Sequence, residues 1–475
     1  MNLSNQYRYI IIAVIFIASC KIPAMLQTPP LQKQPDTFAG SADTTNSVTV
    51  PWRDFFSDPH LTQLIDTALK NNQELLITLQ EIGIARNDIR VRQGKMLPFV
   101  LAGGGAGVEK VGRYTSQGAG DASTEITPGH SVPDWLPDLR LGAYANWEAD
   151  IWKKLGNAKE AAVTRYLATV GGKNFVITNL IAEIANDYYE LLSLDNQLSI
   201  IRQTIGIQKN ALDVMKVQKD AARVTELAVK KFEAEVLNSE GREYGILQQI
   251  TETENEINFL LGRYPQPIER DRTAFLDLLP KQVMTGIPSQ LLANRPDIKQ
   301  AELELKAAAL DVKVARAEFY PSLEISSAIG LNAFKPSYLV KFPESMLFSL
   351  AGDLAGPLIN KSAIKAEFSS ATAMQLQALY NYDKTILNAY LEVTTQQSAI
   401  GNLEKAFVLK EKEVKTLSQS TDIAGDLFKS ARADYFEVLM TQRDALDANL
   451  ELNEIRLNQL KAVTNIYRAL GGGWK

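Results

Sequence analysis

The chain is poor in the residue types on which most enzymes depend. It has one cysteine, Cys20, and two histidines, His60 and His130, among 475 residues. One cysteine cannot form an intramolecular disulfide or a cysteine-based metal cluster, and two distant histidines supply neither an ordinary zinc site nor histidine-based catalysis. The net charge of −5 offers no electrostatic footprint for nucleic acid. We therefore expect no enzyme, no cofactor, no metal site and no nucleic-acid partner.

Long hydrophobic runs are also missing. After the N-terminal segment, no stretch reaches the eighteen or so apolar residues that a membrane-spanning helix needs. If the chain crosses a membrane, it must therefore do so with strands, because only helices and closed strand barrels satisfy the backbone in lipid.

The N-terminus resembles a signal for export and lipid attachment. Residues 10–18 are apolar, and small residues stand directly before Cys20. This arrangement is typical of a bacterial lipobox, so residues 1–19 are expected to be a signal peptide and Cys20 to carry the lipid anchor. A plain secretory signal with a coincidental cysteine is the alternative.

The next segment is expected to connect this anchor to the folded protein. Residues 20–51 are rich in Pro, Thr, Gln and Ser, which favours an extended, lipid-anchored tether. Lys21 follows Cys20 where an aspartate would retain such a lipoprotein in the inner membrane of some bacteria. The expected location is therefore the outer membrane.

The rest of the sequence indicates a tandem duplication. Residues 72–107 align without a gap on residues 295–330, and residues 221–262 align on residues 430–471. A period of about 210–220 residues is far too long for a solenoid repeat, so each copy is half of a structure. We expect a first structural repeat over 52–265, a linker over 266–288, and a second repeat with the C-terminal tail over 289–475.

Each copy predicts the same order of elements. A helix comes first, over 59–96 and 289–319, and ends before Pro98 or Pro321 because proline disfavours helix in the residue before it. A strand hairpin follows. Two long helices complete each copy, over 157–219 and 222–261, then over 361–424 and 428–470.

Residues 140–150 alternate strictly between apolar and polar side chains. Leu141, Ala143, Ala145, Trp147 and Ala149 share one face, as in a half-buried strand. In a soluble sheet that face would meet a core, whereas in an outer-membrane barrel it would meet lipid while the polar face lined water. The local pattern leaves both interpretations open.

Two weaker strands and three tryptophans extend this pattern. The segments 323–328 and 347–358 alternate less strictly, and Trp135, Trp147 and Trp152 would suit an interfacial aromatic belt. Four strands per chain cannot close a barrel, and open strand edges cannot lie in lipid. If the strands are transmembrane, several chains must share one barrel, and three chains would give twelve strands.

The long helices carry apolar residues at heptad spacing. In the first copy they are Ile177, Ile181, Ile184, Tyr188, Leu191, Leu194, Leu198, Ile201 and Ile205. In the second they include Ile386, Tyr390 and Val393, and the returning helix carries a matching apolar pattern that includes Leu446 and Leu460. These are coiled-coil seams, and a soluble four-helix core is the alternative.

Four segments resemble the outer-membrane efflux channel family typified by TolC, and most closely its lipoprotein branch (OprM- and NodT-like). They are WRDFFSDP at 52–59, LLANRPDI at 291–298, ARAEFYPS at 315–322 and ALGGGW at 469–474. The resemblance covers essentially everything from Trp52 onward.

The resemblance implies a mainly α fold with a small membrane β part. Tandem long helical hairpins would form an α-barrel, and four strands per chain would form a twelve-stranded barrel in a homotrimer. It implies an outer-membrane channel surrounded by lipid, with the helices in the periplasm. The channel would be a passive exit duct of a tripartite efflux system, coupled to a periplasmic adaptor and an inner-membrane pump of the RND type.

Charged residues gather where the long helices are expected to turn. Rings of charge in a constriction set ion selectivity and can gate a passage, whereas solvated helix faces are the simpler alternative. The candidates for a periplasmic gate are Asp213, Asp220, Arg223, Asp422, Asp426, Phe428, Arg432 and Asp434.

Two other functions remain to be weighed. A periplasmic coiled-coil lipoprotein could serve as an adaptor or structural spacer, although adaptors usually carry one helical hairpin and this sequence predicts two. An anchored enzyme such as a hydrolase is the other, although no catalytic constellation is present.

Overall fold

The computed structural model describes residues 23–25, 29–30, 33, 35–38, 45, 50–271, 275–278, 280–357, 361–430 and 432–474. Cys20, the predicted anchor, lies outside the described residues. The chain divides into two compact units. We call one the sheet unit (Met1–Pro29, Gly83–Tyr166 and Leu303–Leu379) and the other the helical unit (Pro30–Ile82, Leu167–Glu302 and Tyr380–Lys475).

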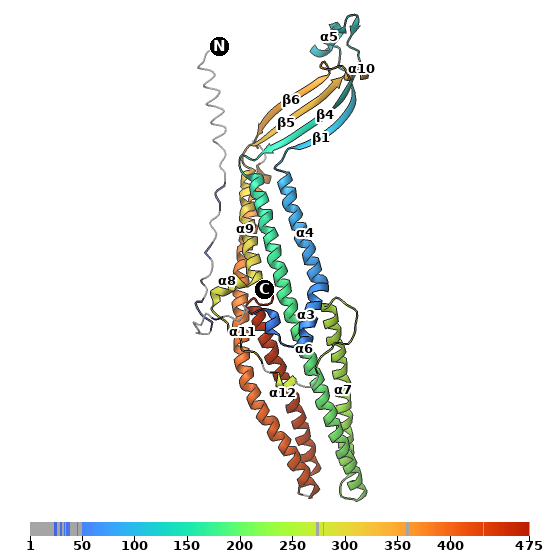
Figure 1. Cartoon of the computed structure of the whole chain (residues 1–475), viewed down its shortest axis with the longest axis vertical. Coiled ribbons are helices and arrows are strands. Elements are labelled where there is room, and N and C mark those ends of the chain that lie inside the picture. The colour runs from blue at the N-terminus through green and yellow to red at the C-terminus, as the bar shows by residue number, and fades with distance from the viewer. Residues whose placement is uncertain are drawn as a thin grey trace. The chain divides into compact units, whose positions relative to one another are not determined.

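The sheet unit is built on a four-stranded antiparallel sheet (Figure 1). Its strands are β1 Phe99–Glu109, β4 Leu136–Ala149, β5 Ser322–Ala333 and β6 Met346–Ala355, in the order β1-β4-β5-β6. The two strand hairpins expected from the sequence are therefore present. The connections at one end also carry the short strands β2 Glu125–Thr127 and β3 His130–Ser131 and the short helices α5 Ser116–Ser123 and α10 Pro336–Leu339.

The other end of the sheet joins helix ends within the same unit. Val312, Phe319 and Phe368 form a small apolar cluster there. Trp152 stacks on Tyr320 with ring centroids 4.6 Å apart and donates its indole N–H to the carbonyl of Pro321 at 2.7 Å. The helix-to-strand passage at Pro321 is thus fixed by one aromatic side chain.

Helices make up the helical unit. The short elements are α2 Trp52–Phe55, α8 Leu291–Asn294 and the 3₁₀ turns η2 Phe275–Asp277 and η3 Pro288–Gln290. The longer helices are α3 Pro59–Asn71, α4 Gln73–Gly94, α6 Lys154–Asp220, α7 Glu226–Leu260, α9 Pro296–Ala317, α11 Ser362–Lys429 and α12 Tyr435–Ala469, of which α4, α6, α9 and α11 also contribute to the sheet unit. None of the described helices is long and apolar enough to cross a bilayer.

The predicted seam of the first long helix forms the centre of the helical unit. Ile181, Ile184, Tyr188 and Leu191 are at most 1% exposed and pack with residues of α2 and α3 in one apolar cluster. The hydroxyl of Tyr188 donates to Asp58 at 2.7 Å, and Asp58 also caps α3. The burial of the apolar seam predicted in α6 is confirmed, and so is the helix start at Asp58-Pro59.

The predictions of one uninterrupted helix over 59–96 and over 289–319 are both wrong, because extended residues at Asn72 and Arg295 interrupt them. Asn72 is extended and separates α3 from α4. Its side-chain oxygen accepts from the backbone N–H of Leu75, and its amide donates to the carbonyl of Leu260, each at 2.9 Å. An asparagine that bonds neighbouring backbone competes with helix continuation and caps the next helix instead.

The predicted starts of both returning helices are also too early. α7 begins at Glu226 rather than 222, after Thr225, whose hydroxyl accepts from the N–H of Ala228. α12 begins at Tyr435 rather than 428, because α11 continues to Lys429. The apolar periodicity continues through the turns between α6 and α7 and between α11 and α12. It therefore predicts which residues form the seam but not where each turn lies.

Two of the motifs behind the family resemblance contact each other. Arg295, only 5% exposed, forms ion pairs with Asp297 and Glu392, each at 2.7 Å, and donates to the carbonyl of Ala469 at 2.9 Å. The same arginine therefore holds the start of α9, the middle of α11 and the end of α12. The segments 291–298 and 469–474 are linked because their side chains and backbone meet.

Glycines make equivalent contacts in the two halves of the chain. A Cβ on Gly471 would lie 2.6 Å from the carbonyl oxygen of Asn294, and a Cβ on Gly262 would lie 2.4 Å from that of Asn71. Both glycines also have positive φ. We propose that the chain is a tandem duplication with the boundaries given above, and this matched pair of contacts supports it.

The described part of the predicted tether contacts the helical unit. Phe38 is fully buried and stacks on Tyr390 with ring centroids 5.4 Å apart. It joins a cluster that contains Leu291, Ala389 and Ile466. The segment between Cys20 and α2 is thus fastened to the protein at Phe38, which the composition of the tether did not predict.

Candidate functional site

The strand register places most apolar side chains of the sheet on one face, which we call the apolar face, whereas Phe99, Leu101 and Leu347 lie on the other. β4 contributes the alternating residues expected from the sequence, because Ala143 pairs with Ala102 and Ile329, and Ala145 with Val100. β5 and β6 contribute Leu323, Ile325, Ile329, Leu331, Met346, Phe348, Leu350 and Leu354, and only Ser327 and Gly352 interrupt their rows.

No protein core covers this face in the described part of the chain. Ile329 is 60% exposed, and Phe348 and Leu350 are each 67% exposed. The described residues contain no second sheet layer against it. A soluble sandwich would bury these side chains, so the structure favours the lipid-facing interpretation of the pattern.

The opposite face of the sheet, which we call the polar face, carries charged and amide groups. It includes Asp138, Arg140, Tyr144, Asn146, Glu148, Glu324, Ser326, Asn332, Ser349 and Asp353. Gly105 and Gly107 of β1 lie opposite Arg140 and Asp138, and a Cβ at Gly105 would meet no heavy atom within 4 Å. The glycine run at 103–107 therefore belongs to a strand, not to a phosphate-binding loop.

A glycine pair lets the two central strands approach closely. Gly142 of β4 pairs with Gly330 of β5. A Cβ on Gly330 would lie 2.4 Å from the carbonyl oxygen of Leu141, and a Cβ on Gly142 would lie 2.6 Å from that of Ile329. Because backbone atoms make these contacts, no side-chain movement could relieve them.

The three tryptophans proposed as a belt lie at two ends of the sheet rather than in one cluster. Trp147 and Trp152 lie at the helix end, where the Trp147 indole donates to the carbonyl of Met96 at 2.9 Å. Trp135 precedes β4 at the other end, 61% exposed, with the ammonium of Lys110 5.2 Å from its ring. β4 is 14 residues long, which at about 3.3 Å per residue separates the two groups by roughly a bilayer thickness.

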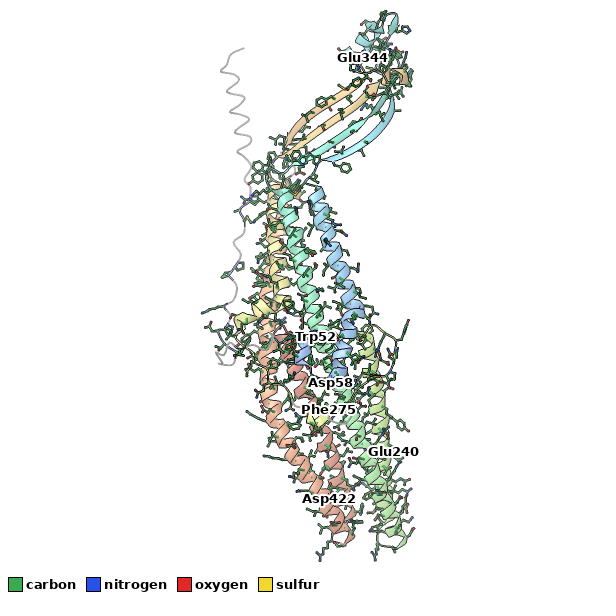
Figure 2. All side chains as sticks on the ribbon, viewed as in Figure 1. Trp52, Asp58, Glu240, Phe275, Glu344 and Asp422 are labelled. Carbon is green, nitrogen blue, oxygen red and sulfur yellow. The ribbon has the colours of Figure 1, made fainter. Side chains whose placement is uncertain are left out.

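The charged candidates at the helical tips are exposed, and those with an ion pair make it locally. Asp213 pairs with Lys216 at 3.0 Å and Asp426 with Lys429 at 3.1 Å, each three residues along the same helix. Asp422 is labelled near the end of α11 in Figure 2. In the part of the chain that the structure describes, no ion pair links the two helical hairpins at their tips.

The remaining candidates lie beside the turns. Asp220 ends α6, Arg223 lies in the turn before α7, and Arg432 and Asp434 lie in the turn before α12. All four are exposed. One chain therefore brings these charges to one end of the helical unit without joining them into a closed cluster.

Phe428 behaves differently from the charged candidates. It packs with Tyr435 and Leu439 against a buried cluster that includes Met215 and Phe232. The tips of the two helical hairpins are thus held together by apolar contacts. Phe428 supports the turn, whereas the charges face solvent.

One acidic site was not predicted from the sequence. Glu183 and Asp187 of α6 and Asn255 and Glu256 of α7 line a cavity of about 400 Å³ with Phe259 and Leu260. Burial, followed by repulsion from Glu256 and Glu190, raises the pKa of Asp187 to about 7, although Lys461 opposes this shift. Carboxylates three or four residues apart on α6 were the available sequence signal. In the described residues, no set of His, Cys, Asp and Glu side chains is placed to hold a metal ion.

The comparison with known families decides the identity. Residues 64–263 and 287–472 match the model of the outer membrane efflux protein family. The chain belongs to this family. It is an outer-membrane efflux channel with a mainly α fold and a small β part, as the resemblance implied, and the match does not support the adaptor or spacer alternative.

Relatives in the family are similar over most of their length. The pyoverdine export outer membrane protein OpmQ of Pseudomonas aeruginosa is 27% identical over 425 residues, covering 89% of this chain and 87% of OpmQ. The probable outer membrane lipoprotein SilC of Salmonella typhimurium is 24% identical over 423 residues, covering 89% and 88% of the two chains.

Solved structures share the fold. The outer-membrane channel OprN superimposes with a TM-score of 0.83 at 22% identity, over 96% of this chain and 100% of OprN. The open state of the MtrE outer membrane channel of Neisseria gonorrhoeae superimposes with a TM-score of 0.81 at 21% identity, over 96% and 99% of the two chains.

Proposed function

We propose that this efflux channel is a homotrimer in which three sheets close one twelve-stranded barrel. The observation that carries the proposal is the uncovered apolar face of a sheet with two open edges, β1 and β6. Unpaired edge groups are costly in lipid, and pairing β1 of one copy with β6 of the next satisfies both edges. The polar face then surrounds a water-filled passage.

The passage is a passive duct, and the energy for export comes from partners. The family of outer membrane efflux proteins and the export function in the name of OpmQ support the assignment of the chain to a tripartite system with a periplasmic adaptor and an inner-membrane pump of the RND type. Catalysis has no role in this proposal. Export of a reporter solute should stop when the pump is deleted, even though the channel remains in the outer membrane.

Cys20 carries the lipid anchor in this proposal. The name of SilC as a probable outer membrane lipoprotein supports it, as does the lipobox sequence before Cys20. A Cys20→Ser variant should lose metabolic labelling with palmitate while the intact protein is labelled. Equal labelling of both proteins would reject the anchor.

The helical tips form the periplasmic constriction. The exposed positions of Arg432 and Asp434 beside the last turn support this role. Arg432→Ala and Asp434→Ala should each raise single-channel conductance in planar bilayers, because a charged constriction limits ion flow. Unchanged conductance in both variants would count against the constriction.

Gel analysis tests the proposal as a whole. Purified protein should migrate as a heat-labile trimer and should be recovered from the outer-membrane fraction. A folded monomer that stays dispersed in the periplasmic fraction without detergent would reject the channel.

A further inference from the structure

The connection between β5 and β6 contains the short helix α10. Residues 334–345, which include α10, lie at the end of the sheet away from the helices (Figure 1), and Figure 2 labels Glu344 there. We call this segment the β5–β6 lid. It lines a cavity of about 620 Å³ together with strand residues.

The strand residues in this cavity show which face the lid covers. Asp138, Arg140 and Asn332 line it, and the register places all three on the polar face, whereas Pro137 and Ala333 line it from the other face. Phe334, Tyr338 and Lys341 line it from the lid. The lid therefore lies over the polar face, so in the proposed barrel it projects into the passage.

Specific contacts hold the lid at its base. The backbone N–H of Asn332 donates to the carbonyl of Ser345 at 2.8 Å, and the Asn332 amide donates to Asp138 at 2.9 Å. Arg140 forms an ion pair with the same aspartate. The Ser345 end of the lid is thus bonded to the backbone of β5, and Asn332, next to the other end, is bonded to β4.

The tip of the lid is held together by its own side chains. The rings of Phe334 and Tyr338 meet edge to face with centroids 5.2 Å apart. The ammonium of Lys341 lies 4.9 Å from the Tyr338 ring. These contacts are local and partly exposed, so opening the tip costs little compared with separating the strands.

We propose that the β5–β6 lid is a gate at the exterior end of the passage and that solutes leave through the cavity beneath it. The cavity joins aromatic rings with charged groups of both signs, a lining that suits small amphiphilic solutes. This inference rests on the proposed function, because it needs the polar face to line the passage. Tyr338 and Lys341 are then residues that control exit.

Thiol labelling of intact cells tests the gate from the outside. Ser349 lies on the polar face of β6, below the lid and exposed. A Ser349→Cys variant of the full-length protein is treated with a bulky, membrane-impermeant maleimide. Adding Phe334→Ala, Tyr338→Ala and Lys341→Ala together should speed labelling about fivefold, because the lid no longer obstructs the passage.

Two further variants keep the result interpretable. Tyr338→Ala alone gives a milder opening if the triple variant is not recovered in the outer membrane. Tyr114→Ala is the matched control, because Tyr114 lies in the other long connection at this end, is fully exposed and does not line the cavity. It should leave the labelling rate unchanged.

Each outcome decides between the two proposals. Faster labelling in the lid variants supports the gate. Equal labelling with and without the lid side chains overturns the gate while leaving the channel in place. Failure of every variant to react at position 349 would overturn the gate together with the proposed function, since the polar face would then not be reachable from outside.

Discussion

The helical unit and the sheet unit use the same kind of hydrophobic pattern with opposite results. Tyr188 and Leu191 of α6 are completely buried by other parts of the same chain, whereas Phe348 and Leu350 of β6 remain two-thirds exposed. Both segments follow the period of their secondary structure. The difference shows that other residues of the chain cover the apolar side chains of the α6 seam, whereas the apolar side chains of the sheet need lipid to cover them.

A smaller difference exists within the helical unit. The seam of α6 is buried within the chain, whereas Leu387, Leu391 and Leu409 of α11 are each more than half exposed. Helices with an unpaired apolar stripe usually have another partner. This supports the proposed homotrimer, because a neighbouring copy would supply that partner.

The largest expected effect comes from the glycine pair of the sheet. Gly330→Val should abolish assembly in the outer membrane, because its Cβ would overlap the backbone of β4. Gly105→Ala, in open space on β1, is the control and should assemble normally. The amount of heat-labile protein in outer-membrane fractions measures both. Normal assembly of the valine variant would show that the close approach of β4 and β5 is not required.

The next effect tests the helical unit by itself. Arg295→Ala should lower the free energy of unfolding by about 3–5 kcal/mol, because it leaves Asp297 and Glu392 without their shared partner and removes the bond to Ala469. Lys299→Ala, which removes an exposed pair with Glu302, should cost about 0.5 kcal/mol or less. Thermal unfolding in detergent, followed by circular dichroism, compares the two. Similar losses would contradict the central role of Arg295.

Arginine substitutions at neighbouring residues of β6 compare the surroundings of the apolar face with those of the polar face. Leu350→Arg on the apolar face should destabilise the folded protein in lipid by about 2–4 kcal/mol. Ser349→Arg on the polar face should cost much less, because it faces water in the proposed passage. Urea unfolding in lipid vesicles measures the difference. Equal costs at the two positions would remove the distinction between the faces.

The smallest effect concerns a partly buried carboxylate in the helical unit, Asp187. The pKa of Asp187 is raised to about 7 by burial and then by Glu256 and Glu190, with Glu183 adding to the rise and Lys461 opposing it. The folded state therefore binds the proton more tightly than the unfolded state, whose aspartate pKa is about 3.9, and stability falls as the pH rises between these values.

Asp187→Asn should remove the loss of stability that accompanies the rise in pH. Its thermal midpoint should exceed that of the parent protein at pH 8 and match it more closely at pH 5. Asp213→Asn, at an exposed tip position, is the control and should show no such pH dependence. A shift of equal size at both pH values would show that Asp187 does not ionise in the folded protein over this range.

The sequence was sufficient to predict the periodic parts of the fold. The alternation in β4 identified both of its faces, and the heptads of α6 identified the buried seam, because each pattern reflects which side of an element meets water. The break at Asn72 was not predicted, and the turns at the two tips were predicted too early in the sequence. A single capping side chain or turn decides them, and the apolar pattern continues past each one.

The contacts that join distant segments were not predictable from periodicity. Arg295 looked like part of a short motif until the structure placed it against α11 and the end of α12. Gly142 and Gly330 gave no sign that they would meet, and Phe38 lay in a segment whose composition indicates a tether. Each depends on a tertiary contact between residues far apart in the sequence.

The contacts of the tip charges and the position of the β5–β6 lid were also not predictable from the sequence. The sequence placed Asp213 and Asp426 near the turns, and the structure gives each a lysine three residues away. The residues of the β5–β6 lid carry no periodic signal. Their position over the polar face follows from the register of β4 and β5, which the sequence did not specify.

The most direct test asks what surrounds the apolar face. Single-cysteine variants at Ile329, Leu350 and Ser349 can be labelled with an environment-sensitive fluorophore in protein reconstituted into vesicles. Lipids with brominated acyl chains should quench the labels at positions 329 and 350 and leave the label at 349 nearly unquenched. Equal quenching at all three positions, or stronger quenching at 349, would contradict a sheet whose apolar face meets lipid and whose polar face meets water.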